Sequence, residues 1–323
     1  MASARDVAER GRLASAAGVL AVMAIGAVFC DARARSTGMM AGSTPFHVMI
    51  GEADTPFQYR LLVPKTLYVI VTIFPGLVSH MRTLLGLAEW LFFVGTFACV
   101  GRLSARLGAG TTAARARVVL ALLVAPFAYL VLPPFRPFYN ASDTPSLFFF
   151  LASTLALIAE RRWAFFVLFL LGTANRETIF VVWLAALLAA VRSGALRREG
   201  PVLLASFVGF VGLKAALAVA YSGNGGAGLV QLRFANGDHG LRALWNLRAL
   251  SGWPMAAWFA ALVVLPLGVA LGLRRNLAHP LLRALVDVAV PTVAGLLVVG
   301  NADEFRMFAD VMTLVLFAVA TAP

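Results

Sequence analysis

Residues 256–273 read AAWFAALVVLPLGVALGL, and residues 118–132 read VVLALLVAPFAYLVL. Neither run contains a charged side chain, and neither shows the strict alternation of polar and apolar residues found in the strands of a membrane barrel. Only α-helices and closed barrels satisfy their backbone hydrogen bonds inside lipid. Together with the similar runs around them, these two stretches predict an all-α fold, a polytopic transmembrane helix bundle.

The composition of the whole chain supports the same prediction. Hydrophobic residues make up 61% of the 323 residues, charged residues only 13%, and the mean hydropathy is +0.86. Soluble domains are about half apolar and about a quarter charged, so lipid must solvate the excess apolar surface here. The net charge of +12 comes from arginines in short groups between apolar runs, which indicates topology determinants. We therefore expect no nucleic-acid partner.

A helix needs about 20 apolar residues to cross a bilayer, and this length divides the sequence into spans. We expect one transmembrane domain over residues 1–323, with a first outer loop at 31–82 and a second at 222–252. About ten helices are predicted, at about 13–30, 83–101, 116–132, 146–160, two short ones within 163–191, and 201–221, 253–273, 284–300 and 307–322.

The run 163–191 is interrupted by Asn175-Arg176-Glu177-Thr178. The arginines before and after this run must lie on the same side of the membrane if the basic loops are cytoplasmic, so the run must enter the bilayer and return. Each half has about 10–15 residues, or roughly 15–22 Å of helix. We predict a hairpin of two short helices whose tip lies within the outer part of the membrane.

The distribution of arginines also predicts the orientation of the chain. Basic residues exceed acidic ones in the loops that contain Arg102, Arg161, Arg192 and Arg274, so we place these loops and both termini in the cytoplasm. Residues 61–79 are apolar enough to cross instead, but that would place the basic loop 102–117 outside. We therefore expect interfacial helices at about 46–60 and 61–75.

The first helix and the amino-acid usage indicate where the chain is located. Residues 1–30 followed by Ala32-Arg33-Ala34 are similar to a signal peptide with its cleavage site, although we expect an uncleaved first helix. Arginine and alanine are abundant and lysine is rare, which is typical of a GC-rich bacterial genome. We expect a multi-pass protein of the bacterial cytoplasmic (inner) membrane.

Polar side chains from several distant segments gather on the predicted outer face. Ionisable groups at membrane depth are costly and usually mark a site, so this gathering is the main functional signal of the sequence. The group consists of Glu52, Asp54, Arg60, Lys65, Arg136, Asn140, Asp143, Arg176, Glu177, Asp303, Glu304 and Arg306.

Each acidic member of this group has a functional and a structural interpretation. Glu52 or Asp54 is a candidate general base, because a carboxylate near an apolar surface can have a raised pKa; alternatively both are solvated loop residues. Asp143 precedes a helix that begins with Pro145, so capping and the helix dipole also explain it. Glu304 lies in a short turn that solvent alone would explain.

The pair Arg176-Glu177 is the most unusual single feature, because each charge costs about 2.5–3.5 kcal/mol at the centre of a bilayer. An internal ion pair that pins the hairpin is one interpretation. The other is an arginine that binds a phosphate while Glu177 orients it.

Four further charged residues lie inside predicted spans: Glu89, Lys214, Asp287 and Asp310. We expect Lys214 to pair with one of these acids, because no chain of histidines and acids suggests a proton relay. No glycine-rich phosphate loop and no HExxH motif occurs, and the four histidines are dispersed. We expect no cofactor; the acids can hold a divalent cation, but nothing requires one.

Several segments resemble the GT-C glycosyltransferases, in particular the protein-O-mannosyltransferase and aminoarabinose-transferase group. Ser142-Asp143-Thr144-Pro145-Ser146-Leu147-Phe148-Phe149-Phe150, running to Arg161-Arg162, is similar to that family's aromatic-rich helix with a basic end. Residues 163–191 resemble its short helix pair with a basic turn. Asp54 before Tyr59-Arg60-Leu61-Leu62-Val63-Pro64 resembles its acidic first loop, and Glu304-Phe305-Arg306 its late outer turn. Uncharacterised bacterial multi-pass proteins carry the same Tyr-Arg-x-Leu-x-Pro and Asn-Arg-Glu-Thr segments.

This resemblance implies a donor sugar linked to polyprenyl phosphate, transfer at the outer face and inversion at the anomeric carbon. Asp54 or Glu52 would be the base; the family usually has an adjacent Asp-Glu pair, whereas here Ala53 separates the two acids. Asp143 would position the acceptor or hold Arg60. Arg176, Arg60 and Lys65 would neutralise the departing lipid phosphate. With the other polar residues of the outer face, the candidate substrate-binding set is Arg60, Lys65, Arg136, Arg176, Glu177, Glu304 and Arg306.

The alternative is a non-catalytic protein, either a transporter or a structural subunit of a membrane complex. A transporter would show broken helices in corresponding places of two halves, and only one broken helix is evident. If Asp54, Asp143 and Arg176 meet in one outer cavity, the enzyme interpretation is favoured over the non-catalytic one. The lipid-linked sugar and membrane lipid are the expected partners, and the sequence identifies no protein partner.

Overall fold

The computed structural model describes residues 4–36, 38, 42–54, 57–107, 126–131, 139–224, 250–277, 279–299 and 305–322. Within these residues every regular element is helical and no strand occurs, which confirms the predicted all-α class. The α-helices are α1 (Ala4–Ser36), α2 (Pro45–Ile50), α3 (Leu62–Ile73), α4 (Met81–Arg106), α6 (Asp143–Ile158), α7 (Arg162–Asn175), α8 (Phe180–Arg192), α9 (Leu196–Ala220), α11 (Trp253–Phe259), α12 (Leu265–Leu273), α13 (Pro280–Val299) and α14 (Ala309–Thr321).

Shorter helical elements connect or interrupt these helices. A π-helical segment, η4 (Ala260–Val264), joins α11 to α12, so the predicted span 253–273 is continuous. The 3₁₀ segments are η1 (Phe57–Tyr59), η2 (Pro75–His80), η3 (Glu177–Ile179), η5 (Arg274–Asn276) and η6 (Phe305–Met307).

Within the described residues, five helical segments are long and apolar enough to cross a membrane, as expected of an integral membrane protein. They are Ala17–Arg35, Pro75–Arg106, Leu196–Ala220, Trp253–Asn276 and Pro280–Leu297. Four other apolar helices are shorter: α3, α6, α7 and α14. The predicted helix at 116–132 lies outside the described residues except for a helical stretch at 126–130. Five potential spans are therefore established, and the total of about ten remains a prediction.

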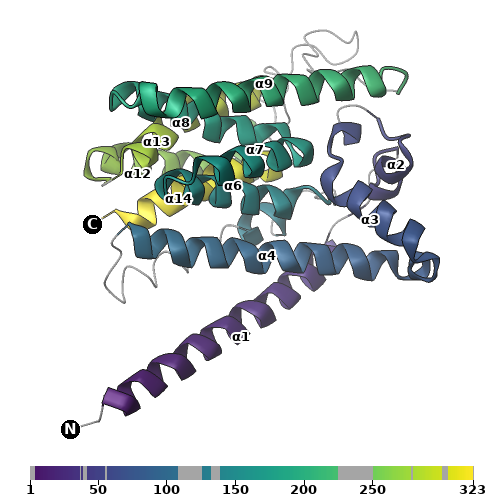
Figure 1. Cartoon of the computed structure of the whole chain (residues 1–323), viewed down its shortest axis with the longest axis horizontal. Helices are drawn as coiled ribbons and strands as arrows, with labels where there is room; N and C mark the ends of the chain where they lie inside the picture. The colour runs from purple at the N-terminus through teal and green to yellow at the C-terminus, as the bar shows by residue number, and fades with distance from the viewer. Residues whose placement is uncertain are drawn as a thin grey trace.

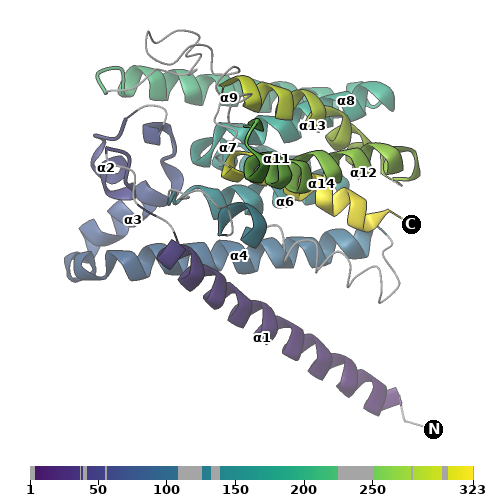
Figure 2. The same cartoon turned by 180° about the vertical axis from the view of Figure 1, so that it is seen from behind.

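The helices form an elongated bundle in which α4 and α9 lie on opposite sides (Figure 1). The helices α6, α7, α8, α13 and α14 lie between them, and α1 packs obliquely against α4. Both views place the start of α1 and the end of α14 toward one end of the molecule, and α2 and α3 at the other (Figure 2). We call the end with α2, α3 and η3 the loop end, and the end with Arg102, Arg161 and Arg198 the arginine end.

Residues 163–191 form two short helices, as predicted. The helices α7 and α8 have 14 and 13 residues, and the break falls at Arg176, whose backbone is extended with φ −163° and ψ 135°. The Asn175 amide donates hydrogen bonds to the Ser142 carbonyl (2.9 Å) and the Ser146 hydroxyl (3.1 Å). Gly172 allows the turn to fold back, because a Cβ there would lie 2.9 Å from Ile179.

The first loop contains short helices instead of a span. The helix α3 has 12 residues, about 18 Å, whereas the hydrocarbon core is about 30 Å thick, and Pro75 starts a separate element after it. The amide of Leu61 donates to the Ala174 carbonyl (2.9 Å), which ties this loop to the tip of the α7–α8 hairpin. The predicted segments 46–60 and 61–75 thus correspond to α2 with η1 and to α3.

The helix α1 extends to Ser36, six residues beyond the predicted end. It approaches α4 closely at Gly26, where a Cβ would lie 2.9 Å from Phe93, and the rings of Phe29 and Phe93 stack with centroids 4.9 Å apart. The extension carries Arg33 into the protein, where its side chain is only 1% exposed. The contacts of this buried arginine explain why the helix continues.

Candidate functional site

A group of buried charged side chains lies near the loop end of the bundle. Its members come from α1, α4, the start of α6, the break before η3, η6 and α14, and each is at most 6% exposed. Charges removed from water in this way are tolerated only when they are paired and hydrogen-bonded. We refer to these six residues as the buried network: Arg33, Glu89, Asp143, Arg176, Arg306 and Asp310.

Asp143 is the centre of the buried network, because three arginines from three different elements reach it. Its Oδ2 lies 2.9 Å from Arg33 Nη2 and 3.8 Å from Arg306 Nη1, and its Oδ1 lies 3.1 Å from Arg176 Nη1. Asp143 is also the first residue of α6, where a negative charge complements the helix dipole. Helix capping therefore accounts for only part of its environment.

Arg33 joins α1 to α4 and α6. Its Nη1 lies 2.7 Å from Glu89 Oε1 and donates a hydrogen bond to Thr144 Oγ1 at 2.7 Å, and its Nη2 donates to the Asn140 carbonyl at 2.9 Å. Thr144 in turn donates to Glu89 (3.2 Å). The guanidinium also lies over the ring of Tyr139, 5.1 Å from its centroid. These contacts explain the extension of α1 beyond residue 30.

The tip of the hairpin is held by ion pairs to other helices. Arg176 lies 3.6 Å from Asp310 on α14 as well as 3.1 Å from Asp143, and Thr178 donates to Asp310 at 2.7 Å. Glu177 lies 3.4 Å from Lys214 on α9. Both charges therefore hold the tip of the hairpin in place, as the structural interpretation expected. They do so through ion pairs to other helices: Arg176 to α6 and α14, and Glu177 to α9.

Arg60 differs from the arginines of the buried network. Its guanidinium lies over the ring of Phe57, 4.9 Å from the centroid, and its buried Nε has no hydrogen-bond partner. No carboxylate of the described residues lies within ion-pair distance of it. Burial and the positive charge of Arg176 lower the pKa of Arg60 below its ordinary value, and Arg306 adds to this effect, while nearby carboxylates, chiefly Glu177, partly offset it. The loop end thus holds a cationic side chain next to two like charges.

The two candidate bases lie outside the buried network. The Asp54 amide donates to the Gly42 carbonyl (3.1 Å), and Gly42 has φ +72°; a Cβ at Gly42 would lie 2.9 Å from Asp54 Oδ2. The carboxylate of Asp54 is half-buried and makes no ion pair with a described residue. Glu52 is exposed. The structure brings Asp143, Arg176 and Arg306 together, with Arg60 beside them, but does not join Asp54 to them by an ion pair.

Of the remaining predicted binding residues, the structure describes Lys65, which is not joined to the buried network. Lys65 donates to the Met49 carbonyl at 2.7 Å and lies over the ring of Tyr68, so it stabilises the first loop. Arg136 and Glu304 lie outside the described residues. The sequence predicted Arg33 to lie in a loop, so its place in the buried network was missed. Its position at the end of an apolar helical segment could have indicated that the helix continues.

The predicted partner of Lys214 was wrong. We expected an acid within a span, but Lys214 pairs with Glu177 in the hairpin tip. The three acids of the spans have other partners: Glu89 pairs with Arg33, Asp310 with Arg176, and Asp287 with Arg192 and Arg274 near the arginine end. The expectation failed because helical periodicity shows which face a charge lies on but not which neighbouring element approaches that face.

Two hollows lie near Arg60 and differ greatly in size. A cavity of about 10 Å³, lined by Arg60, Phe57 and Asn140 among others, has room for about one water molecule. A groove of about 590 Å³ begins at Leu62 and runs between α3, α4 and α6. We call it the α3–α4 groove, and its walls are almost entirely apolar, including Leu62, Ile70, Leu84, Phe92, Phe148 and Leu171.

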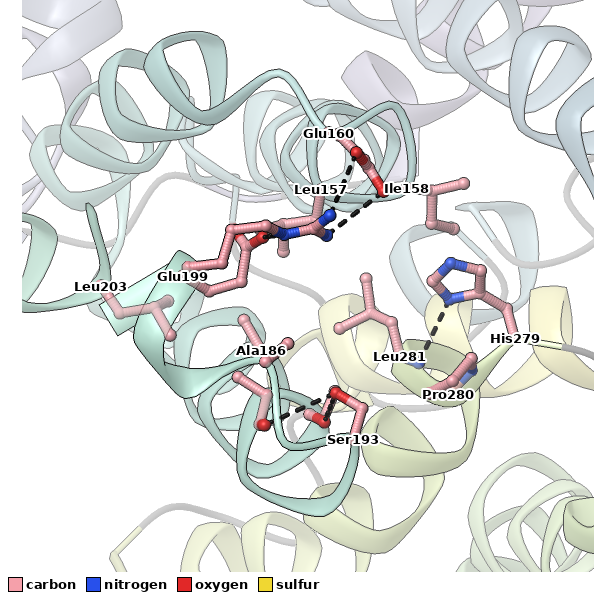
Figure 3. Close-up of a pocket in the computed structure, with 14 residues that line it drawn as sticks. Leu157, Ile158, Glu160, Ala186, Ser193, Glu199, Leu203, His279, Pro280 and Leu281 are labelled. Atoms are coloured by element: carbon pink, nitrogen blue, oxygen red, sulfur yellow. Dashed lines mark hydrogen bonds and ion pairs between the residues drawn. The ribbon is translucent and has the colours of Figure 1, made fainter. Parts of the chain in front are cut away.

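A second polar pocket, of about 200 Å³, lies at the arginine end between α6, α8, α9 and the start of α13 (Figure 3). Arg198 pairs with Glu160 (3.2 Å) and Glu199 (2.7 Å), and Arg162 makes two hydrogen bonds to Glu199 at 3.0 and 3.1 Å. Burial lowers the pKa of the nearby His279. The charges of this pocket neutralise one another, so it lacks the surplus charge found beside Arg60.

The described residues contain no group of three or more His, Cys, Asp or Glu side chains placed to hold a metal ion. Comparisons of the chain with protein-family models, with curated proteins and with solved structures found no match. The arrangement of side chains at the loop end is therefore the basis for any functional conclusion.

Proposed function

We propose that the protein is a GT-C-like glycosyltransferase of the bacterial inner membrane that moves a sugar from a polyprenyl-phosphate donor to an acceptor at the outer face. One observation carries the proposal: Arg60 makes no ion pair with a carboxylate of the described residues, although the positive charges of Arg176 and Arg306 act on it. Such a site gains stability when an anion binds, because the anion offsets the repulsion between like charges.

Phosphate is the anion that fits this site best. A guanidinium offers paired N–H donors that match phosphate oxygens, and such charge-assisted hydrogen bonds are stronger than neutral ones. Asp143 and Asp310 hold Arg176 in place, so little reorganisation is needed at that side of the site. The cavity beside Arg60 measures only about 10 Å³, so the first loop must shift when a donor binds.

The α3–α4 groove supplies a place for the lipid part of the donor. It begins at Leu62, two residues after Arg60, and continues along α4 toward Phe92 and Phe148. A phosphate at Arg60 would therefore have its polyprenyl chain at the mouth of an apolar groove. A soluble nucleotide-sugar would leave this groove empty, which favours a lipid-linked donor.

Asp54 is the proposed general base, because its carboxylate makes no ion pair with a described residue and is therefore available to accept a proton. Asp54 accepts the proton of the acceptor hydroxyl while the hydroxyl oxygen forms a bond to the anomeric carbon. The bond between that carbon and the phosphate oxygen breaks, and its electron pair leaves with polyprenyl phosphate. Arg60 and Arg176 stabilise the charge that develops on the departing phosphate. Glu52 is the alternative base, and neither role requires a metal ion.

Binding of decaprenyl phosphate to the purified chain in neutral detergent tests the proposal. Arg60→Gln should weaken binding by about tenfold or more, since a charged hydrogen bond contributes about 1.5–3 kcal/mol. Arg35→Gln is the matched control, because Arg35 lies at the end of the first potential span and its side chain is 79% exposed. Equal affinity of the Arg60 variant and the control would remove Arg60 from the phosphate site.

Turnover of a panel of polyprenyl-phosphate sugars, followed by release of polyprenyl phosphate, tests the catalytic part. Asp54→Asn should abolish release while decaprenyl phosphate still binds, and Glu52→Gln should leave turnover almost unchanged. The reverse pattern would identify Glu52 as the base. Binding without any turnover of the unmodified protein would favour the non-catalytic alternative, a transporter or a subunit of a membrane complex.

A further inference from the structure

A larger groove lies at the arginine end, between α4, α6 and α7. Its volume is about 730 Å³, and Arg102, Arg106 and Arg161 stand at its rim. The rest of its lining is apolar and mostly small, including Gly95, Ala98, Ala152 and Ala156 beside the larger Leu155 and Leu168. We call it the α4–α6 groove. It combines a cationic rim with a floor that has almost no polar groups.

No Asp or Glu of the described residues lines the groove. The sequence contains no Asp or Glu from Trp90 to Ser142, which includes all of the chain between α4 and α6. Arg102, Arg106 and Arg161 make no ion pair within the part of the chain that the structure describes, and all three are exposed. The pocket of Figure 3 at the same end is different, because Glu160 and Glu199 neutralise its arginines.

The α4–α6 groove continues into the α3–α4 groove. Both are lined by Gly95 and Phe148, and a Cβ at residue 95 would lie 3.0 Å from the Phe148 ring. Arg102 and Arg106 occupy the last two turns of the potential span Pro75–Arg106. Side chains at such positions reach the level of the lipid headgroups while the preceding turns face the acyl chains.

We infer that the α4–α6 groove binds an anionic phospholipid, with the headgroup phosphate at Arg102, Arg106 and Arg161 and one acyl chain on the floor that leads to Gly95. Basic pockets between spanning helices recognise anionic headgroups, and within the part of the chain that the structure describes no acid lines this groove. A soluble anion would leave the apolar floor exposed to water, and a neutral lipid would leave the rim without a partner. Its headgroup site lies at the other end of the bundle from the proposed phosphate site at Arg60, although the two grooves share Gly95 and Phe148. The inference does not depend on the proposed enzymatic activity.

Native mass spectrometry of the full chain in neutral detergent tests the inference, with phosphatidylglycerol and phosphatidylcholine added in parallel. Phosphatidylglycerol adducts should form at lower lipid concentration than phosphatidylcholine adducts. Arg102→Gln/Arg106→Gln should raise the phosphatidylglycerol concentration needed by about tenfold or more, from the loss of two charges at a membrane surface. Both side chains are exposed, so the variant should fold.

The control variant is Arg197→Gln/Arg275→Gln, which removes the same charge from exposed positions at the same end. An equal loss of adducts in this control would overturn the inference, because net charge alone would then explain binding. Gly95→Leu should weaken phosphatidylglycerol binding by filling the floor beside Phe148. Displacement of the lipid by millimolar inorganic phosphate, or equal binding of the two lipids, would also contradict an anionic phospholipid site.

Discussion

The two ends of the bundle use charge in different ways. At the loop end, Asp143 and Asp310 are at most 1% exposed and pair with arginines from distant elements. At the arginine end, Arg198 is 54% and Glu160 is 64% exposed, and their pair lies in water. The same types of residue therefore have very different energies, since a pair in water contributes little while a buried charge without its partner is strongly unfavourable.

This difference indicates which end is specialised. Protein stability does not require the buried network, because apolar residues of similar volume often fill such positions at equal or better stability. A bundle that retains six charges there has arranged them for another purpose, and the unpaired Arg60 beside them suggests an anionic ligand. The charges at the arginine end have the distribution expected of topology determinants.

The largest effect is expected at the centre of the buried network. Asp143→Asn should lower the free energy of unfolding by about 3–5 kcal/mol, because the buried side chains of Arg33, Arg176 and Arg306 lose a shared counter-charge. Titration of the detergent-solubilised chain with SDS, followed by tryptophan fluorescence, measures this loss.

At the arginine end, Asp287→Asn is the variant to compare with Asp143→Asn. Asp287 also pairs with two arginines, Arg192 and Arg274, but these side chains are 47% and 35% exposed. The expected loss is about 1 kcal/mol or less. Similar losses for the Asp143 and Asp287 variants would show that burial does not separate the two ends.

A second prediction concerns the pairing of α1 with α4. Arg33→Met and Glu89→Met should each destabilise the protein, whereas the double variant should cost about 2 kcal/mol less than the sum of the two, because neither charge is left alone. The coupling will be incomplete, since Arg33 also pairs with Asp143. The same SDS titration gives the four free energies, and additive losses would exclude a direct interaction.

The positions of most helices follow from the sequence, because spans need long apolar runs and basic residues lie at their ends. The predicted break at residues 175–178 coincides with the break between α7 and α8. The end of α1 was predicted too early because Arg33 is charged, and only its partners on α4 and α6 make a buried position possible there.

The sequence predicted several residues of the candidate site, but not which of them form ion pairs with each other. Asp143, Arg176 and Arg306 were selected as polar residues near the outer ends of spans, and the structure brings them together. The pairing of Glu177 with Lys214 was not predicted, because it depends on which turn of α9 faces the hairpin. Such a register is set by packing between helices, which a single sequence does not reveal.

The smallest predicted effect lies at the arginine end, where the backbone should matter more than the charge. Glu160 has φ +56° and follows α6 in a hydrogen-bond pattern in which the amides of Glu160 and Arg161 donate to the carbonyls of Leu157 (3.0 Å) and Ala156 (2.8 Å). Glycine is the residue favoured in this left-handed position. Glu160→Gly loses only the exposed pair with Arg198, worth about 0.5 kcal/mol.

Glu160→Gly should therefore stabilise the protein by about 0.5 kcal/mol, because relief of the left-handed conformation is worth about 1 kcal/mol. Glu160→Ala loses the same ion pair but keeps the strained backbone, so it should be less stable than the glycine variant by about 1 kcal/mol. If both variants were destabilised equally, the pair with Arg198 would dominate. An exposed ion pair would then outweigh backbone strain at the end of the molecule where charge is expected to matter least.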